Sequence, residues 1–168
     1  MSPTVLPYEE TLQNALRELH KNSFGVLATA EGNRVTARQM MLVFDELKIS
    51  CFTTNFTRKY KQISVNKNVA LAFANIQVDG TASIGGQTCD PQNAWFLNAV
   101  KSQFPKVYEH YRDWLENPNT TCEVIKITPK RIALFYGPPD PNRHLDVINI
   151  EAQTSFRYYS SENWPPEY

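Results

Sequence analysis

Residues 51–63 read CFTTNFTRKYKQI, and no other stretch says as much about the fold of this chain. An apolar strand over residues 47–52 leads into a turn rich in hydroxyl groups, and a short helix follows. The first turn of that helix carries Arg58, Lys59 and Lys61. Cations are unfavourable there, because the N-terminus is the positive end of the helix dipole. The stretch therefore predicts a strand–turn–helix unit whose charges are misplaced for a helix left alone.

Two interpretations of this turn are open. An anion bound to the free N–H groups of the first helical turn would make the cations favourable, and Thr53, Thr54 and Thr57 would add hydroxyl donors beside it. The simplest such anion is a phosphate group. Alternatively, the turn is a threonine N-cap followed by solvated lysines, an arrangement that surface helices tolerate.

The composition favours a small anionic ligand over a long polyanion. A chain of 168 residues is typical of one domain and is long enough to bury a sizeable core. Its 17 lysines and arginines balance 17 aspartates and glutamates, so no net field draws it to nucleic acid or to an anionic membrane. The basic residues at 58–61 are therefore a local feature.

The cysteines and the apolar runs indicate a cytoplasmic protein. Cys51, Cys89 and Cys122 form neither a metal-ligand spacing nor an even disulfide set, so no metal site is predicted. No charged-then-apolar leader pattern appears near residue 1, and no apolar run approaches membrane-spanning length. We therefore expect a reducing, cytoplasmic setting and no membrane partner.

The hydrophobic pattern predicts about six antiparallel strands with helices inserted between them. The expected strands are residues 24–30, 34–44, 47–53, 69–78, 81–88 and 122–136. The expected helices are residues 7–22, 57–66 and 91–116, the last divided at Pro105. Asp79-Gly80 reads as the turn of a hairpin, and Gly85-Gly86 as a bulge or turn.

Long strands joined by tight turns predict a mainly β fold with helices, in the α+β class: an antiparallel, closed or nearly closed β-barrel with peripheral helices. No strand–glycine-loop–helix fingerprint of a dinucleotide site is present. We assign residues 1–137 to the barrel domain. Three prolines within five residues mark residues 138–168 as a loop-rich C-terminal tail, which packs on the same domain or on a partner subunit.

Three segments in this order resemble a known family. They are RQMMLV at residues 38–43, FTTNFTRK at residues 52–59 with NKNVALAF at 66–73, and VDGTA at residues 78–82. Together they resemble the pyridoxamine 5′-phosphate oxidase-like FMN-binding split barrels, particularly the small general-stress-protein-like branch. The resemblance covers about residues 20–90, and residues 122–136 match the closing strand more loosely.

The resemblance implies a cofactor, a set of binding residues and an assembly. It implies FMN at the interface of a homodimer, with two sites. The FMN phosphate would be held by Arg38, Thr57, Arg58 and Lys59. The backbone of Gln39, Met40 and Met41 would run beside the isoalloxazine edge, Thr53 and Thr54 would reach polar atoms of the cofactor, and Asn75 would come from the second subunit.

The residues taken alone are less specific. Arg38 lies in mid-strand, where an arginine is either solvated or paired with a buried anion. Met40 and Met41 are more often core residues than a cofactor wall, and Asn75 could be a bulge or edge residue. Near the C-terminus, Arg143-His144 lies beside the prolines and is expected to be an exposed polar loop.

The resemblance implies a flavin-dependent oxidoreductase acting on an unknown small molecule or taking electrons from a nicotinamide donor, with no assigned catalytic residue. One alternative is a non-enzymatic flavin or haem binding protein of the same fold, serving storage or sensing. Another is a small β-barrel that binds single-stranded nucleic acid through exposed aromatic residues, although the zero net charge argues against it. A deazaflavin in place of FMN is also compatible with the sequence.

Overall fold

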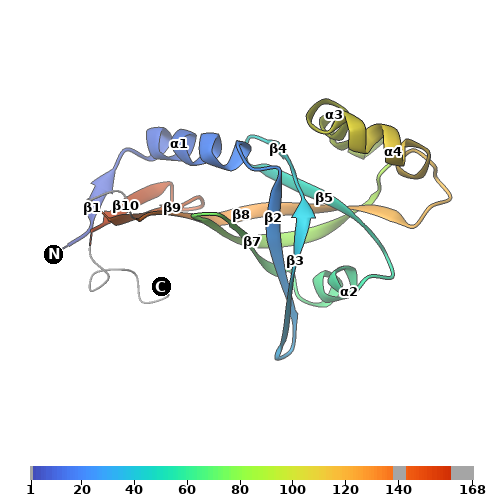
Figure 1. The fold of residues 1–168 in the computed structure, drawn as a ribbon. Helices are drawn as coiled ribbons and strands as arrows, with labels where there is room; N and C mark the ends of the chain where they lie inside the picture. Colours follow the sequence, from blue (N-terminus) through green and yellow to red (C-terminus); the bar gives the residue numbers. More distant parts are fainter. Residues whose placement is uncertain (1, 138–142, 160–168) are drawn as a thin grey trace.

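The computed structural model describes residues 2–137 and 143–159 of the chain. Figure 1 shows a long twisted antiparallel sheet with helices at its two ends. The strands are β1 (Thr4–Leu6), β2 (Phe24–Glu31), β3 (Arg34–Met41), β4 (Val43–Asp45), β5 (Lys48–Thr54), β6 (Asn68–Phe73), β7 (Ile76–Gln87), β8 (Cys122–Tyr136), β9 (His144–Asn149) and β10 (Thr154–Tyr158). The helices are α1 (Tyr8–His20), α2 (Arg58–Val65), the 3-10 helix η1 (Pro91–Asn93), α3 (Ala94–Gln103) and α4 (Pro105–Leu115).

The predicted α+β split barrel is confirmed. The sheet runs in the order β3-β2-β6-β7-β8, and β8 also pairs with β5, which pairs with β4. Only Leu42 separates β3 from β4, so one bent strand pairs with β2 at its first half and with β5 at its second half. This strand joins the two ends of the sheet around one hydrophobic interior.

The split in the barrel lies along strand β8. Residues 122–127 of this strand pair with β5, whereas residues 131–136 pair with β9 on the same edge. The other edge of β8 pairs with β7 along nearly its whole length. Strands β5 and β9 therefore diverge from each other around Pro129, which lacks the N–H group that a ladder would need there.

Two apolar clusters hold the helices against the sheet. The interior cluster is formed by inward side chains of the strands together with the apolar face of α1, including Leu16 and Leu19. Helices α3 and α4 pack on the outside of β4, β5 and β8 through a second cluster around Phe96 and Leu115. None of the helices in the described residues combines the length and the apolar character needed to cross a membrane.

The hairpin predicted at Asp79-Gly80 was wrong. The turn between β6 and β7 lies five residues earlier, at Ala74-Asn75, and Asp79 and Gly80 are inside β7. The register with β8 shifts between them, which marks a bulge. Gly80 serves a close backbone approach, because a Cβ there would collide with the carbonyl oxygen of Thr128. The bulge expected near Gly85-Gly86 is confirmed by a second register shift.

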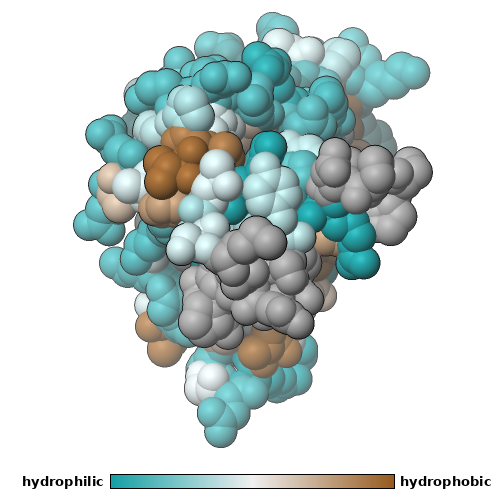
Figure 2. Space-filling view, turned by 90° about the vertical axis from the view of Figure 1, so that its left-hand side faces the viewer, coloured by the Kyte–Doolittle hydropathy of each residue, from teal (hydrophilic) through white to brown (hydrophobic). Residues whose placement is uncertain are grey.

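The prediction of a loop-rich tail was also wrong for residues 144–158. Strands β9 and β10 extend the sheet, and β1 pairs with β10 at its far edge. His144 is buried, not part of an exposed loop, and it stacks on Tyr136 with ring centroids 4.4 Å apart. Residues 138–142 and 160–168 of the predicted tail lie outside the described residues. Figure 2 views the end of the molecule that carries β1 and β10, which is mostly hydrophilic with isolated hydrophobic patches.

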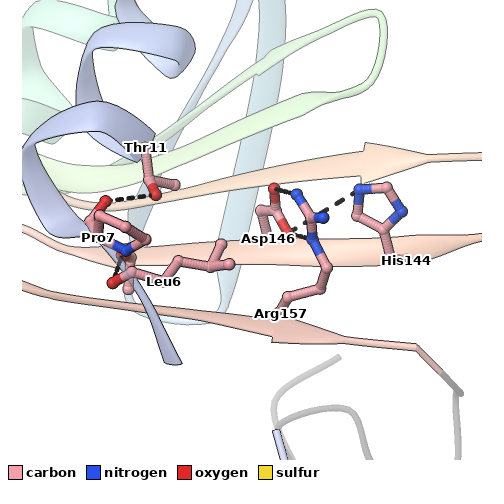
Figure 3. Close-up of polar contacts among 7 residues, drawn as sticks. Leu6, Pro7, Thr11, His144, Asp146 and Arg157 are labelled. Atoms are coloured by element: carbon pink, nitrogen blue, oxygen red, sulfur yellow. Dashed lines mark hydrogen bonds and ion pairs between the residues drawn. The ribbon is translucent and has the colours of Figure 1, made fainter. Parts of the chain in front are cut away.

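A buried ion pair holds β9 to β10. Arg157 donates to both carboxylate oxygens of Asp146, at 2.7 and 2.8 Å, while Asp146 is 4% exposed. His144 lies beside the pair, with Nε2 4.0 Å from the carboxylate (Figure 3). The sequence did not predict these strands, because the prolines beside them and their short apolar runs are typical of a loop. The strands are stabilised by pairing with β8 and by this ion pair.

Candidate functional site

The N-terminus of α2 presents backbone donors that nothing in the described chain satisfies. Thr57 precedes the helix in an extended conformation, and its side chain does not cap it. Its hydroxyl instead donates to the carbonyl of Thr54 at 2.9 Å and lies 2.9 Å from the hydroxyl of Thr53. The N–H groups of residues 58–60 precede the first intrahelical bond, from Lys61 N–H to the Thr57 carbonyl, and have no acceptor among the described residues.

Arg38 reaches the inner side of this region from β3. Its guanidinium donates to the Leu27 carbonyl at 3.0 Å, to the Thr29 hydroxyl at 2.7 Å and to the Thr36 hydroxyl. All of these partners are neutral. An arginine anchored only by neutral acceptors keeps its full charge available to a ligand.

Gln62 on α2 locks this anchor in place. It is 0% exposed, and its side-chain oxygen accepts hydrogen bonds from the hydroxyls of Thr29 and Thr36, at 2.6 and 2.7 Å. Its amide group donates to the Arg34 carbonyl at 3.2 Å. The same two threonine hydroxyls thus connect helix α2 to the guanidinium of Arg38, so the helix and the strand share one rigid polar network.

Arg38, Arg58 and Lys59 form what we call the cationic cluster. Burial and the neighbouring charge of Arg58 lower the pKa of Arg38, and burial followed by the charge of Arg38 lowers the pKa of Lys59. Within residues 2–137 and 143–159, none of the three forms an ion pair with a carboxylate. Three mutually repelling cations without a counter-ion are unfavourable in the free protein.

The thiol of Cys51, which lies near the cluster, cannot neutralise it. Cys51 is 1% exposed on the inner face of β5, and burial raises the pKa of its thiol to about 12. The thiol is therefore uncharged at neutral pH. The cluster, the unsatisfied N–H groups and the hydroxyls of the threonine turn together fit a multiply charged anion such as a phosphate monoester.

The structure brings together seven of the sequence-predicted site residues. Arg38, Thr53, Thr54, Thr57, Arg58 and Lys59 are joined by the contacts described above or lie on the same turn, and Gln39 follows Arg38 on β3. Gln39 is exposed, whereas Met40 packs on the interior cluster and Met41 on the second cluster. Among the described strands, β3 pairs with β2 alone, so alternate backbone N–H groups of residues 39–41 face away from any described strand and could meet a ligand along the outer edge.

Asn75 is not brought to this site within one chain. It lies in the β6–β7 turn, where its side chain donates to the Phe135 carbonyl at 3.0 Å. In the sheet register, Arg38 lies opposite Leu27, and Leu27 lies opposite Leu71. Asn75 is four residues beyond Leu71, which corresponds to about 13 Å along the strand direction. Within one chain, Asn75 therefore lies apart from the cationic cluster.

Sequence reasoning missed Thr29, Thr36 and Gln62. Their spacing is not a motif, because a threonine in a strand and a glutamine in a helix are ordinary surface residues. One signal was present. Gln62 is next to the apolar Ile63 on the buried side of α2, and a polar side chain that is buried there needs a hydrogen-bond partner. Which partner it finds depends on how α2 packs on β2 and β3.

Comparison with known proteins identifies relatives of this architecture. The family model described as pyridoxamine 5′-phosphate oxidase matches residues 12–136. General stress protein 26 from Bacillus anthracis superposes with a TM-score of 0.57 at 21% identity, over 83% of this chain and 98% of that one. A pyridoxamine 5′-phosphate oxidase-related, FMN-binding protein from Nostoc punctiforme gives a TM-score of 0.63 at 15% identity, over 94% and 100%.

Haem storage protein HutZ from Vibrio cholerae shares the fold as well, with a TM-score of 0.55 at 14% identity, over 74% of this chain and 91% of that one. At such identities these likenesses establish the fold alone. No curated protein has a significantly similar sequence.

Proposed function

The chain belongs to the pyridoxamine 5′-phosphate oxidase family, and on that premise we propose that it binds FMN at the cationic cluster and acts as a flavin-dependent oxidoreductase. The observation that carries the proposal is the cluster itself. Arg38, Arg58 and Lys59 converge on a helix N-terminus with no carboxylate partner among the described residues. The phosphate of FMN is doubly charged and would supply the missing counter-ion.

Each group of the site would then have a distinct part. Arg38, held in place by Gln62 and the two threonines, would give a fixed guanidinium fork, and Lys59 a point charge. Thr53 and Thr57 would turn their hydroxyl protons from the contacts that they make with each other and with the Thr54 carbonyl toward the same phosphate. The free edge of β3 at residues 39–41 would donate backbone N–H groups to the polar edge of the ring system, which both orients it and adjusts its electronics. Bound FMN would supply reversible two-electron chemistry.

Homodimerisation belongs to the same proposal. The outer face of β2 and β3 exposes large apolar side chains: Phe24 is 53% exposed, Val26 40% and Val35 67%. Alanines fill the positions between them on β2, β3 and β6. A continuous apolar sheet face of this kind marks an interaction site. A second copy of the chain placed there would also bring its Asn75 toward the first copy's flavin.

The test of flavin binding is an absorbance spectrum of the protein as purified and after addition of FMN. The visible absorbance bands of oxidised flavin, at a stoichiometry of about one flavin per chain, would support the proposal. Mass analysis of the compound released by heat would distinguish FMN from a deazaflavin, and a Soret band would point to haem instead. A colourless protein that does not bind FMN at micromolar concentration would refute the proposal.

Reduction by NADH or NADPH separates an enzyme from a binding protein. Bleaching of the bound flavin under anaerobic conditions supports the oxidoreductase, and bound flavin that neither nucleotide reduces supports storage or sensing.

Dimerisation is tested by sedimentation with Val26→Asp, whose carboxylate would be buried at the proposed interface. Lys106→Asp on the exposed side of α4 is the control. All three cysteines are free, which is consistent with the cytoplasmic setting expected from the sequence.

A further inference from the structure

The split in the barrel opens a pocket that the flavin proposal does not use. Where β5 and β9 part from each other along the edge of β8, the surface is hollowed to about 440 Å³ beneath the first turn of α3. This volume lies within the range of sites for small organic ligands, about 300–1,000 Å³. Its lining comes from β5, α3, β8 and the segment after β9, and comprises Leu47, Lys48, Ile49, Ser50, Trp95, Lys126, Ile127, Thr128, Pro129 and Ile150.

The walls of this split pocket are mainly apolar, and one of its polar groups is an unpaired cation. Lys126 is half-buried on the outward face of β8, opposite Ser50 of β5. Its stem crosses Gly85 so closely that a Cβ at that glycine would lie 2.5 Å from Lys126 Cε. Lys126 forms no ion pair with any carboxylate of the described residues.

The second lysine of the pocket is already engaged. Lys48 pairs with Asp45 at 3.0 Å, and its ammonium group lies 5.9 Å from the centre of the Trp95 ring. Both side chains of that ion pair are more than half exposed. Among the described residues, Lys126 is therefore the lining group with a charge still available, and the half-buried Leu47, Trp95 and Ile150 supply apolar surface in the same pocket.

We propose that the split pocket binds a small amphipathic carboxylate, with its apolar body against Leu47, Trp95 and Ile150 and its carboxylate on Lys126. An apolar surface with one available cation selects an apolar anion over a neutral or cationic molecule of the same shape. The site does not depend on flavin. It lies at the Lys48–Ser50 end of β5, whereas the threonine turn lies beyond the opposite end of that strand.

The probe pair is octanoate and octanol, which differ in the charged group and share the apolar chain. Binding is followed on the three tryptophan indole N–H resonances of the ¹⁵N-labelled full chain, with the Trp95 signal assigned from Trp95→Phe. Octanoate is expected to shift the Trp95 resonance. Lys126→Met keeps the apolar stem and removes the charge, so it should weaken octanoate about tenfold or more and leave octanol within about twofold. Lys106→Met on α4 is the matched control.

The titration is repeated with saturating FMN, which should leave octanoate affinity unchanged. The proposal is overturned by any of three results: octanoate that does not move the Trp95 resonance, a Lys126→Met variant that binds octanoate like the wild type, or displacement of octanoate by FMN. Because the readout is the indole signal in the absence of flavin, failure of the flavin proposal would not affect it. A folded Lys126→Met protein is verified by the unchanged signals of the other two tryptophans.

Discussion

Removing the charge of Lys59 should lower the affinity for FMN without lowering the stability of the flavin-free protein. In Lys59→Met the half-buried stem is kept, and the repulsion with Arg38 and the cost of burying the ammonium group disappear. Ligand affinity and stability are therefore expected to change in opposite directions. An ordinary structural lysine would behave differently, since its loss removes an ion pair and lowers stability.

The magnitudes follow from the contacts. A charge-assisted hydrogen bond to phosphate contributes about 1.5–3 kcal/mol, which corresponds to about a 10- to 150-fold increase in the Kd for FMN. The relief of repulsion is smaller, about 0.5 kcal/mol, because the side chain is partly exposed and screened by solvent. In a domain of this size that amounts to a rise of about 1–2 °C in the Tm of the flavin-free protein.

Fluorescence titration with FMN and thermal unfolding of the flavin-free protein measure the two quantities. Lys61→Met removes an exposed charge from the same helix and is expected to change the Kd by less than about threefold. The reasoning is refuted if Lys59→Met binds FMN as tightly as the wild type, or if its Tm falls by several degrees.

The lowered pKa of Lys59 predicts a pH dependence with a definite sign. Between the lowered folded value and the ordinary 10.5, the unfolded chain binds more protons than the folded one, so the stability of the free protein rises with pH in that window. The affinity for FMN falls over the same window, because the ammonium group is lost. Lys59→Arg should bind FMN with no alkaline loss below pH 10.5, and an unchanged alkaline limb in that variant would contradict the assignment.

Three further outcomes concern stability and reactivity. Gly80→Ala should lower the free energy of unfolding by about 1–3 kcal/mol in chemical denaturation, because its Cβ would collide with the β8 backbone. Gly32→Asn, at an open position with a φ of +53°, should lower the free energy of unfolding much less. Arg157→Met should cost about 2–3 kcal/mol by leaving the buried Asp146 carboxylate without its partner, and the double variant with Asp146→Asn should recover part of the loss. Cys51, with its thiol pKa raised to about 12, should resist iodoacetamide at pH 8 until the protein is unfolded, and rapid labelling of the native protein, read by mass spectrometry, would contradict its burial.

Local chemistry in the sequence was enough to locate the candidate phosphate site. The threonine turn and the cations of α2 were predicted from residues close together in the chain, whereas the arginine of β3 was assigned through the family resemblance. The structure places them on one turn or in one polar network. Strand periodicity likewise predicted the strands of the barrel, although the division between β6 and β7 was placed at residues 79–80 and not at residues 74–75. These features are encoded by neighbouring residues, because the N–H groups of a helix end and the alternation of a strand are local properties.

Where pairing competes with turn chemistry, the sequence alone was misleading. Asp79-Gly80 carries a strong hairpin signal, yet both residues lie inside β7, since the glycine is needed for close approach to β8. The segment after residue 143 reads as loop, yet β9 and β10 form because β8 extends past β5 and offers them an edge. Backbone hydrogen bonds to a distant strand decided both cases.

The sequence by itself determined the family, the barrel strands and the positive charge of the turn that follows β5. Only the tertiary structure decided that Gln62 would fix Arg38 through two threonines, that no carboxylate of the described residues would form an ion pair with the cationic cluster, and that β5 and β9 would part to leave a pocket beside Lys126. The physical reason is that charge and periodicity belong to residues and their neighbours. The partner of a buried polar group and the space between strands depend on segments that meet only when the chain is folded.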